Sequence, residues 1–201
     1  LDILQKTINK TIKLSEKFVG KPKLVVHFGG MCLKECKNCE KIEKEMYEKS
    51  IENFKKLNYD PEKIEILPEN LPPKPWYLGG EWNQYGFMSE KYMIEFCKVF
   101  NLKITYDICH ASLYCNFVKK DIVDYTKKIK PYISHIHISD TIGINGEGVQ
   151  INEGETTFLP IFKQLKDVNF SWVTEIWSGH LNNGNGCYES MKRLQEYNNY
   201  L

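Results

Sequence analysis

Arginine is almost absent from this chain of 201 residues, because Arg193 is the single arginine among 27 basic side chains. Proteins that read nucleic acids use arginine to contact bases and phosphates, and they usually carry an excess of positive charge. The formal net charge here is +1. The composition therefore disfavours nucleic acid as a partner.

Long apolar runs and a secretion signal are also missing. No apolar stretch approaches the roughly 20 residues that cross a bilayer, and the opening LDILQKTINK lacks the apolar core and cleavage site of a signal peptide. The seven cysteines are odd in number, and Cys97 and Cys109 lie inside apolar patterns, unlike a secreted disulfide framework. We therefore predict a cytoplasmic protein with no membrane association.

What the sequence does contain is an alternation of apolar strand patterns with helical ones, in a single domain over residues 1–201. The expected strands are 23–28, 63–70, 102–110, 132–140 and 170–177. The expected helices are 1–19, 40–57, 90–100, 117–129, 157–166 and 187–198. This order predicts an α/β fold with a parallel sheet, either doubly wound or a (β/α)8 barrel. No G-x-G-x-x-G follows the first strand, which argues against the dinucleotide-binding version of the doubly wound sheet.

A carboxylate or an imidazole stands at or near the C-terminal end of every expected strand. These residues are His27, Glu69, Asp107, His137 and Glu175, with His110 just beyond the third strand. In a parallel barrel the C-terminal ends of the strands meet on one face, where barrel active sites are built. One such residue alone is usually a helix cap or a hydrogen-bonded core residue, but the coincidence over five strands predicts a site.

The chemistry of this set is that of a divalent-metal centre. Carboxylate oxygens with one imidazole suit Mn²⁺, Mg²⁺, Co²⁺ or Zn²⁺. We therefore expect one divalent ion, which can polarise a substrate oxygen.

At these residues the chain resembles the xylose-isomerase-like TIM barrels, which comprise sugar-phosphate isomerases and epimerases with the apurinic endonucleases as a related branch. The resemblance is carried by VVHFGG, PENLP, YDICHASLY, HIHISDTIG, GEGVQINEGETTF and VTEIW, in the family's order, over about residues 20–180. It implies a (β/α)8 barrel and a metal-dependent sugar or sugar-phosphate isomerase or epimerase, which moves a proton next to a carbonyl.

The resemblance also implies a role for each matching residue. Glu69, Asp107, His137 and Glu175 become the metal ligands, and Glu69 and Glu175 also move the proton. His110 is expected to bind a substrate hydroxyl, while His27 and Trp177 line the pocket and Glu155 lies near its mouth. Apart from the resemblance, the loop 71–88, with Trp76, Tyr77, Trp82 and Tyr85, is expected to wall the pocket with aromatic rings.

Two departures from the family pattern stand out. The family has strands before VVHFGG, whereas this chain starts at Leu1 in the preceding helix. We therefore expect either a fragment of a protein of about 270 residues or a truncated member whose sheet edges a partner covers, with a homo-oligomer left open. The endonuclease branch has an extra Asp-x-His for further metals, where this chain has Gly148 and Gln150, which disfavours the alternative of a phosphodiesterase.

Cys32, Cys36 and Cys39 form a C-x3-C-x2-C spacing that leaves further alternatives. One is a radical S-adenosylmethionine enzyme with an iron–sulfur cluster, supported by a Gly-Gly-Glu at 79–81. That Gly-Gly-Glu lies ten residues past the strand it should follow. The triad can also hold a structural zinc ion as a second metal site, or consist of three plain loop cysteines. A non-catalytic sugar-binding barrel is the alternative of a different class.

Overall fold

The computed structural model describes residues 1–33, 39–197 and 199. The long parallel strands are β1 (Lys23–Val26), β3 (Glu65–Pro68), β7 (Ile104–Asp107), β8 (Ile133–Ile138) and β11 (Ser171–Thr174). The helices are α1 (Asp2–Ser15), α2 (Cys39–Phe54), α3 (Glu90–Phe100), α4 (Ile108–Val118), α5 (Ile122–Ile129), α6 (Phe158–Leu165) and α7 (Leu181–Leu194), with 3-10 turns at Lys130–Tyr132 and Gln195–Tyr197. Short strands in the connections are β2 (Gly30–Cys32), β4 (Trp76–Tyr77), β5 (Gly80–Glu81), β6 (Asn83–Tyr85), β9 (Asp140–Ile142) and β10 (Gly146–Val149).

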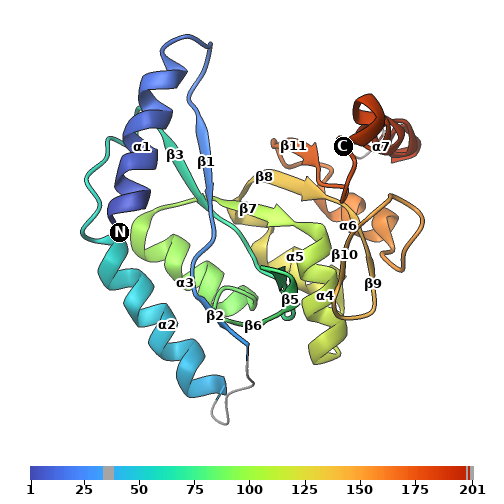
Figure 1. The fold of residues 1–201 in the computed structure, drawn as a ribbon, viewed down its shortest axis with the longest axis horizontal. Helices are drawn as coiled ribbons and strands as arrows, with labels where there is room; N and C mark the ends of the chain where they lie inside the picture. The colour runs from blue at the N-terminus through green and yellow to red at the C-terminus, as the bar shows by residue number, and fades with distance from the viewer. Residues whose placement is uncertain (34–38, 198, 200–201) are drawn as a thin grey trace.

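The parallel strands lie side by side in chain order. β1 pairs with β3, and β8 pairs with both β7 and β11. A bridge between Glu69 and Thr105 joins the two groups, which gives the order β1-β3-β7-β8-β11. Figure 1 shows these strands curving into an arc with the helices on its outside. The arrangement confirms the predicted alternation and brings the C-terminal ends of the strands to one edge.

The core lies between the strands and the helices that cover them. Ile66, Tyr106 and Ile136, each from a different strand, are fully buried. Aromatic rings fill the space toward α2 and α3, where Phe96 contacts Phe28 at a centroid distance of 4.9 Å and other rings pack around them. Each such buried side chain contributes on the order of 1.5–3 kcal/mol, so the packing holds the strand ends in place.

Several predicted boundaries were wrong. The helix expected over 1–19 ends at Ser15, and the helix expected over 187–198 is α7, Leu181–Leu194. The strand expected over 102–110 ends at Asp107, and the helix expected over 117–129 is two helices, α4 and α5. The side chain of Asp107 accepts a hydrogen bond from the backbone N–H of His110 (2.6 Å) and caps the start of α4. The sequence ICHASLYC is apolar almost throughout, so it carries no helical period that would reveal α4.

Three connections expected as loops contain strands. The connection before α2 holds β2, residues 71–88 hold β4, β5 and β6, and residues 140–149 form the antiparallel hairpin of β9 and β10. These segments are short and rich in glycine and polar residues, so the two-residue alternation typical of strands is missing.

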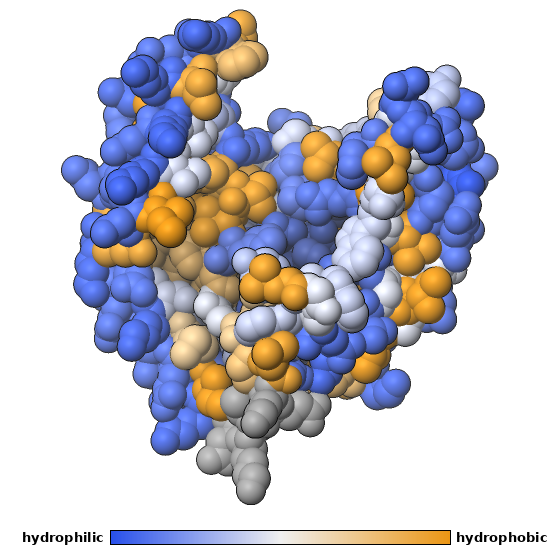
Figure 2. Space-filling model, in the orientation of Figure 1, coloured by the Kyte–Doolittle hydropathy of each residue, from blue (hydrophilic) through white to orange (hydrophobic). Residues whose placement is uncertain are grey.

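The two outer strands of the arc leave a hollow between them. Within the described residues, β1 pairs with β3 alone and β11 pairs with β8 alone. Figure 2 shows the molecule hollowed between the side that carries α1 and the side that carries α7. Lys23 of β1 spans this gap at the N-terminal ends of the strands, because its Nζ donates to the carbonyl of Ser134 (2.6 Å) and to Oγ of Ser171 (3.0 Å).

No helix in the described part of the chain is both long enough and apolar enough to pass through a bilayer.

Candidate metal centre

Four of the residues at the strand ends meet at one point. Glu69 follows β3, Asp107 ends β7, His137 lies near the end of β8 and Glu175 follows β11. Each offers a ligand atom, and these atoms all lie within 4.8 Å of one another. Asp107 and His137 are register partners in the β7–β8 pair, so their side chains leave the sheet on the same face.

The size of this cluster fits a divalent ion. Protein ligands bind such ions at roughly 2.0–2.6 Å, so two ligands on opposite sides of an ion are about 4–5 Å apart. Three carboxylates and one imidazole form the donor set, and all but Glu175 are buried. Buried carboxylates at this separation repel each other, and a cation between them removes the repulsion.

Glu69 is the centre of the hydrogen-bond network. Its Oε2 lies 2.8 Å from Nε2 of His27, and its Oε1 lies 3.1 Å from Nδ1 of His137 and 3.4 Å from Nδ1 of His110. Burial would raise the pKa of Glu69, but the hydrogen bonds from the three histidines outweigh burial and hold that pKa well below its usual value. Glu69 is therefore an anion that several imidazoles share.

The partners of Glu69 have strongly displaced pKa values. Burial, with the charge of Glu69, raises the pKa of Asp107 to about 7, although His110 and His137 oppose the shift. Burial would lower the pKa of His137, but its hydrogen bonds to Glu175 (3.2 Å) and Glu69 raise it to about 10. Such displaced values in a cluster are typical of functional sites.

The buried amide of Asn70 fixes the spacing between two of these residues. Its Nδ2 donates to the carbonyl of Asp107 (2.8 Å), and its Oδ1 accepts from the backbone N–H of Asp107 (2.8 Å). The side chain thus continues the β3–β7 pairing where the two strands separate. Glu69 and Asp107 are held at a fixed distance as a result.

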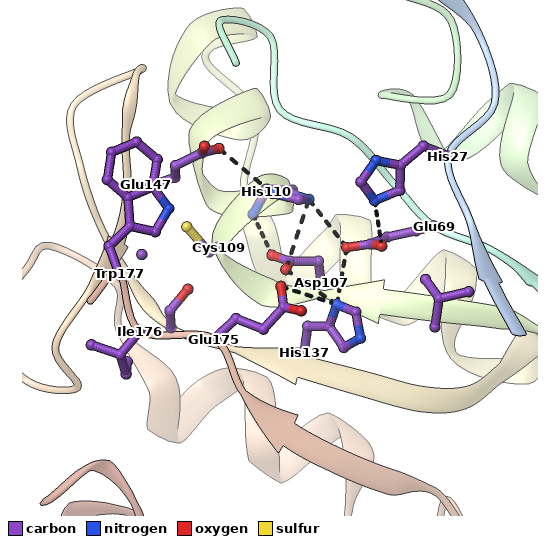
Figure 3. A pocket seen from close by; sticks show the side chains of 13 residues that line it. His27, Glu69, Asp107, Cys109, His110, His137, Glu147, Glu175, Ile176 and Trp177 are labelled. Carbon is purple, nitrogen blue, oxygen red and sulfur yellow. Dashed lines mark hydrogen bonds and ion pairs between the residues drawn. The ribbon is translucent and has the colours of Figure 1, made fainter. Parts of the chain in front are cut away.

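A pocket of about 510 Å³ opens above the cluster. Figure 3 shows the predicted pocket residues His27, His110 and Trp177 around it with the four ligand candidates. His110 stands in the first turn of α4, where its Nδ1 lies 2.9 Å from the carbonyl of Asn70. Burial would lower the pKa of His110, but the charges of Asp107 and Glu69 raise it to about 10.

Glu147 is a pocket residue that the sequence reasoning missed. It lies on β10, its carboxylate is 3.6 Å from Nε2 of His110, and burial raises its pKa. Glu155, expected at the pocket mouth, does not line this pocket and instead accepts a hydrogen bond from the backbone N–H of Gly143 (2.9 Å). Both residues belong to the loop GEGVQINEGE, and only the pairing of β9 with β10 distinguishes their positions.

Gly148 and Gln150, which stand where the endonuclease branch has an Asp-x-His, have structural contacts. The carbonyl of Gly148 accepts from the backbone N–H of Trp177 (2.9 Å). The Gln150 side chain donates to the carbonyl of Gly186 (3.0 Å) and accepts from Ser190 (2.8 Å).

The cysteine triad is described in part. Cys32 is half-buried on β2, Cys36 lies outside the described residues, and Cys39 begins α2 with a side chain that is likewise outside them. The Gly-Gly-Glu at 79–81 belongs to the turn and second strand of the β4–β5 hairpin, where Glu81 accepts from Asn145 (2.7 Å). A zinc site or a cluster at the cysteines stays a prediction.

Of the four aromatic residues predicted to wall the site pocket, Trp76 and Tyr77 line a second pocket of about 430 Å³, whereas Trp82 and Tyr85 line neither of the two pockets. Trp76 and Tyr77 lie on one side of it, and His27, His110 and Glu147 line both pockets. The two pockets therefore adjoin each other at these three side chains.

Comparisons with known proteins agree with this fold. An uncharacterized protein of Methanocaldococcus jannaschii, MJ1614, is 27% identical over 201 residues, which is 96% of this chain and 68% of that protein. The solved structure of a D-tagatose 3-epimerase-like protein is similar with a TM-score of 0.67 and 20% identity, over 98% of this chain and 68% of the other.

Two further solved structures share the fold. D-psicose 3-epimerase from Clostridium cellulolyticum H10 matches with a TM-score of 0.63 and 11% identity, over 100% of this chain and 70% of the other. The probable 3-DHS dehydratase AsbF from Bacillus anthracis matches with a TM-score of 0.62 and 17% identity, over 94% and 69% of the two chains. The model of the family described as "Xylose isomerase-like TIM barrel" matches residues 6–197. The predicted fold is confirmed, and the chain belongs to this family.

Proposed function

We propose that this chain is a divalent-metal-dependent sugar isomerase or epimerase that transfers a proton at a carbon next to a carbonyl. The observation that carries the proposal is the cluster of Glu69, Asp107, His137 and Glu175, whose ligand atoms lie within 4.8 Å of one another under a pocket. The structural similarity to D-psicose 3-epimerase and to a D-tagatose 3-epimerase-like protein supports the reaction type.

The positions of the four residues assign a role in metal binding to all of them and a role in proton transfer to two of them. A divalent ion bound by them supplies a Lewis acid that polarises the substrate carbonyl and acidifies the neighbouring C–H bond. Glu69 and Glu175 flank Asp107 and His137 in the order of the strands. One carboxylate removes the proton from one side of the substrate carbon, and the other returns a proton from the opposite side.

The two carboxylates differ in how deeply their side chains are buried. The Glu69 side chain is 1% exposed and is held by His27, whereas the Glu175 side chain is 47% exposed. Glu175 can therefore change its position between the ion and the substrate more easily than Glu69. His110 and Trp177 line the pocket above them and orient the sugar.

The experiment measures metal content and proton exchange on the same protein samples. With Mg²⁺ or Mn²⁺ and D-tagatose or D-psicose in D₂O, NMR should show deuterium entering the carbon next to the carbonyl, and epimer should form. Glu69→Gln and Glu175→Gln should lower turnover by about 100-fold or more, while Asp107→Asn and His137→Gln should lose the ion.

The control is Glu153→Gln, because Glu153 pairs with Arg193 (2.7 Å) away from the pocket. Metal-dependent turnover that persists in both the Glu69 and the Glu175 variant would make their catalytic role wrong. Sugar binding without proton exchange would instead identify a non-catalytic sugar-binding barrel.

A further inference from the structure

Glu147 adds a fourth carboxylate to the pocket that the metal cluster does not use. The group of possible ligands consists of Glu69, Asp107, His137 and Glu175, and Glu147 is not part of it. Its side chain is 13% exposed and points to the pocket, on the far side of His110 from Glu69 (Figure 3). A largely buried carboxylate at this place requires a physical reason.

The β9–β10 hairpin holds Glu147 firmly in this position. At its base, Asp140 accepts hydrogen bonds from the backbone N–H groups of Thr141, Gly154 and Thr156 (2.8–2.9 Å). Next to Glu147, Gly148 lies so close to the ring of Trp177 that a Cβ atom there would be 2.0 Å from it. The carboxylate therefore belongs to an ordered wall of the pocket.

The contact between Glu147 and His110 leaves hydrogen-bonding capacity unused. The distance of 3.6 Å from Oε2 of Glu147 to Nε2 of His110 is too long for a hydrogen bond. Both residues line the metal pocket and also the adjoining pocket walled by Trp76 and Tyr77. A sugar that reaches from the metal cluster toward these aromatic rings passes Glu147.

A carboxylate and a sugar hydroxyl are complementary, whereas a carboxylate and a phosphate repel each other. We propose that Glu147 accepts a hydrogen bond from a hydroxyl group of an uncharged sugar and that its negative charge selects against the phosphorylated sugar. This inference rests on the proposed function and decides between the two substrate classes, sugar and sugar phosphate, that the sequence leaves open.

The test compares D-tagatose with its 1-phosphate and its 6-phosphate on the Mg²⁺-loaded protein. The wild type should have a higher kcat/KM for D-tagatose than for either ester. Glu147→Ala should raise KM for D-tagatose by about 10- to 100-fold, the effect of losing one hydrogen bond to a charged group. Glu147→Gln retains an acceptor and loses the charge, so it should reduce the preference over the esters by about tenfold or more.

Glu153→Gln, the same chemical change outside the pocket, should behave like the wild type, and every variant should keep the metal content of the wild type. A wild type that prefers a phosphate ester would overturn the inference, as would Glu147 variants with unchanged KM and unchanged preference.

A binding measurement distinguishes an error in the proposed reaction from an error in the role of Glu147. If the wild type turns over none of the three compounds, binding of D-tagatose and of its esters to the Mg²⁺-loaded protein is measured by saturation-transfer NMR. Binding of D-tagatose that weakens in Glu147→Ala supports the inference although the proposed reaction is wrong. Tighter binding of an ester, or binding unaffected by Glu147→Ala, overturns it.

Discussion

Single side chains decide the chemistry of this pocket, and Asn70 shows how one amide can set the distance between two acids. It makes two hydrogen bonds to the backbone of Asp107 and is completely buried. Glu69 precedes it directly in the chain. The geometry of the cluster thus depends on a residue that offers no ligand itself.

Asn70→Ala should lower the free energy of unfolding by roughly 2–4 kcal/mol, because it leaves the buried N–H and C=O of Asp107 without partners. Urea unfolding measures this loss, and metal titration should show weaker binding. Asn9→Ala is the matched control, since the Asn9 amide contacts exposed Gln5 (3.2 Å) and its loss should cost under about 0.5 kcal/mol. Equal effects of the two substitutions would contradict the role of Asn70.

The pKa of His137, about 10, predicts that metal binding releases protons. At pH 7 the imidazole is protonated, and a ligand nitrogen must lose its proton before it binds an ion. Affinity should therefore rise as the pH rises from 7 toward 10. Calorimetry in two buffers with different ionisation enthalpies should show the release of about one proton or more, and identical heats in the two buffers would refute this.

The same pKa has a consequence for the stability of protein prepared without metal. Because the folded-state pKa of His137 lies above the usual value of 6.5, its ion pairs with Glu69 and Glu175 contribute fully below about pH 6.5. This contribution is lost as the pH rises toward 10. Added metal should offset the loss, since it binds the deprotonated imidazole.

Among the elements, the β9–β10 hairpin is a short connection that contributes residues to the pocket. It carries Glu147, and its contact with Trp177 ties it to the segment after β11. The sequence predicts an irregular loop for these residues, and the structure shows a hairpin.

Gly148→Ala should disrupt this element. Its φ is +69°, and the added Cβ would overlap the ring of Trp177. Gly143→Ala separates the two causes, because Gly143 has a φ of +62° with no atom within 4 Å of the added Cβ. We expect a loss of about 1 kcal/mol for Gly143→Ala and clearly more for Gly148→Ala in urea unfolding. Faster hydrogen exchange at the Trp177 amide should accompany the second change alone.

At the scale of the whole molecule, the five parallel strands form an arc. Its two outer strands face each other across a hollow, and Lys23 connects them. Lys23→Met keeps the aliphatic stem and removes the hydrogen bonds to Ser134 and Ser171. We expect a loss of about 0.5–1.5 kcal/mol and faster hydrogen exchange in β11. Lys21→Met is the control, because Lys21 contacts Pro61 in a nearby loop (2.9 Å). Unchanged exchange in β11 would contradict the bridging role.

Features that depend on a local sequence pattern can be predicted from the sequence, whereas features that depend on contacts between distant segments cannot. Glu69, Asp107, His137 and Glu175 lie at or near the ends of apolar strand patterns, so their convergence can be expected from the chain alone. The start of α4 cannot be predicted in this way, because the apolar pattern continues across Asp107. Glu147 and Glu155 are equivalent in sequence, and it is the hairpin, held by Asp140 and Trp177, that brings one of them into the pocket.

The amide of Asn70 also bears on how the protein responds to a cation. Ligands that are already oriented lose little conformational entropy when an ion arrives, so the free energy of binding goes into affinity instead of folding. A centre of this kind differs from a zinc finger, whose chain folds around its ion. Chelation should accordingly remove the proposed activity while leaving the circular dichroism spectrum of the folded chain intact.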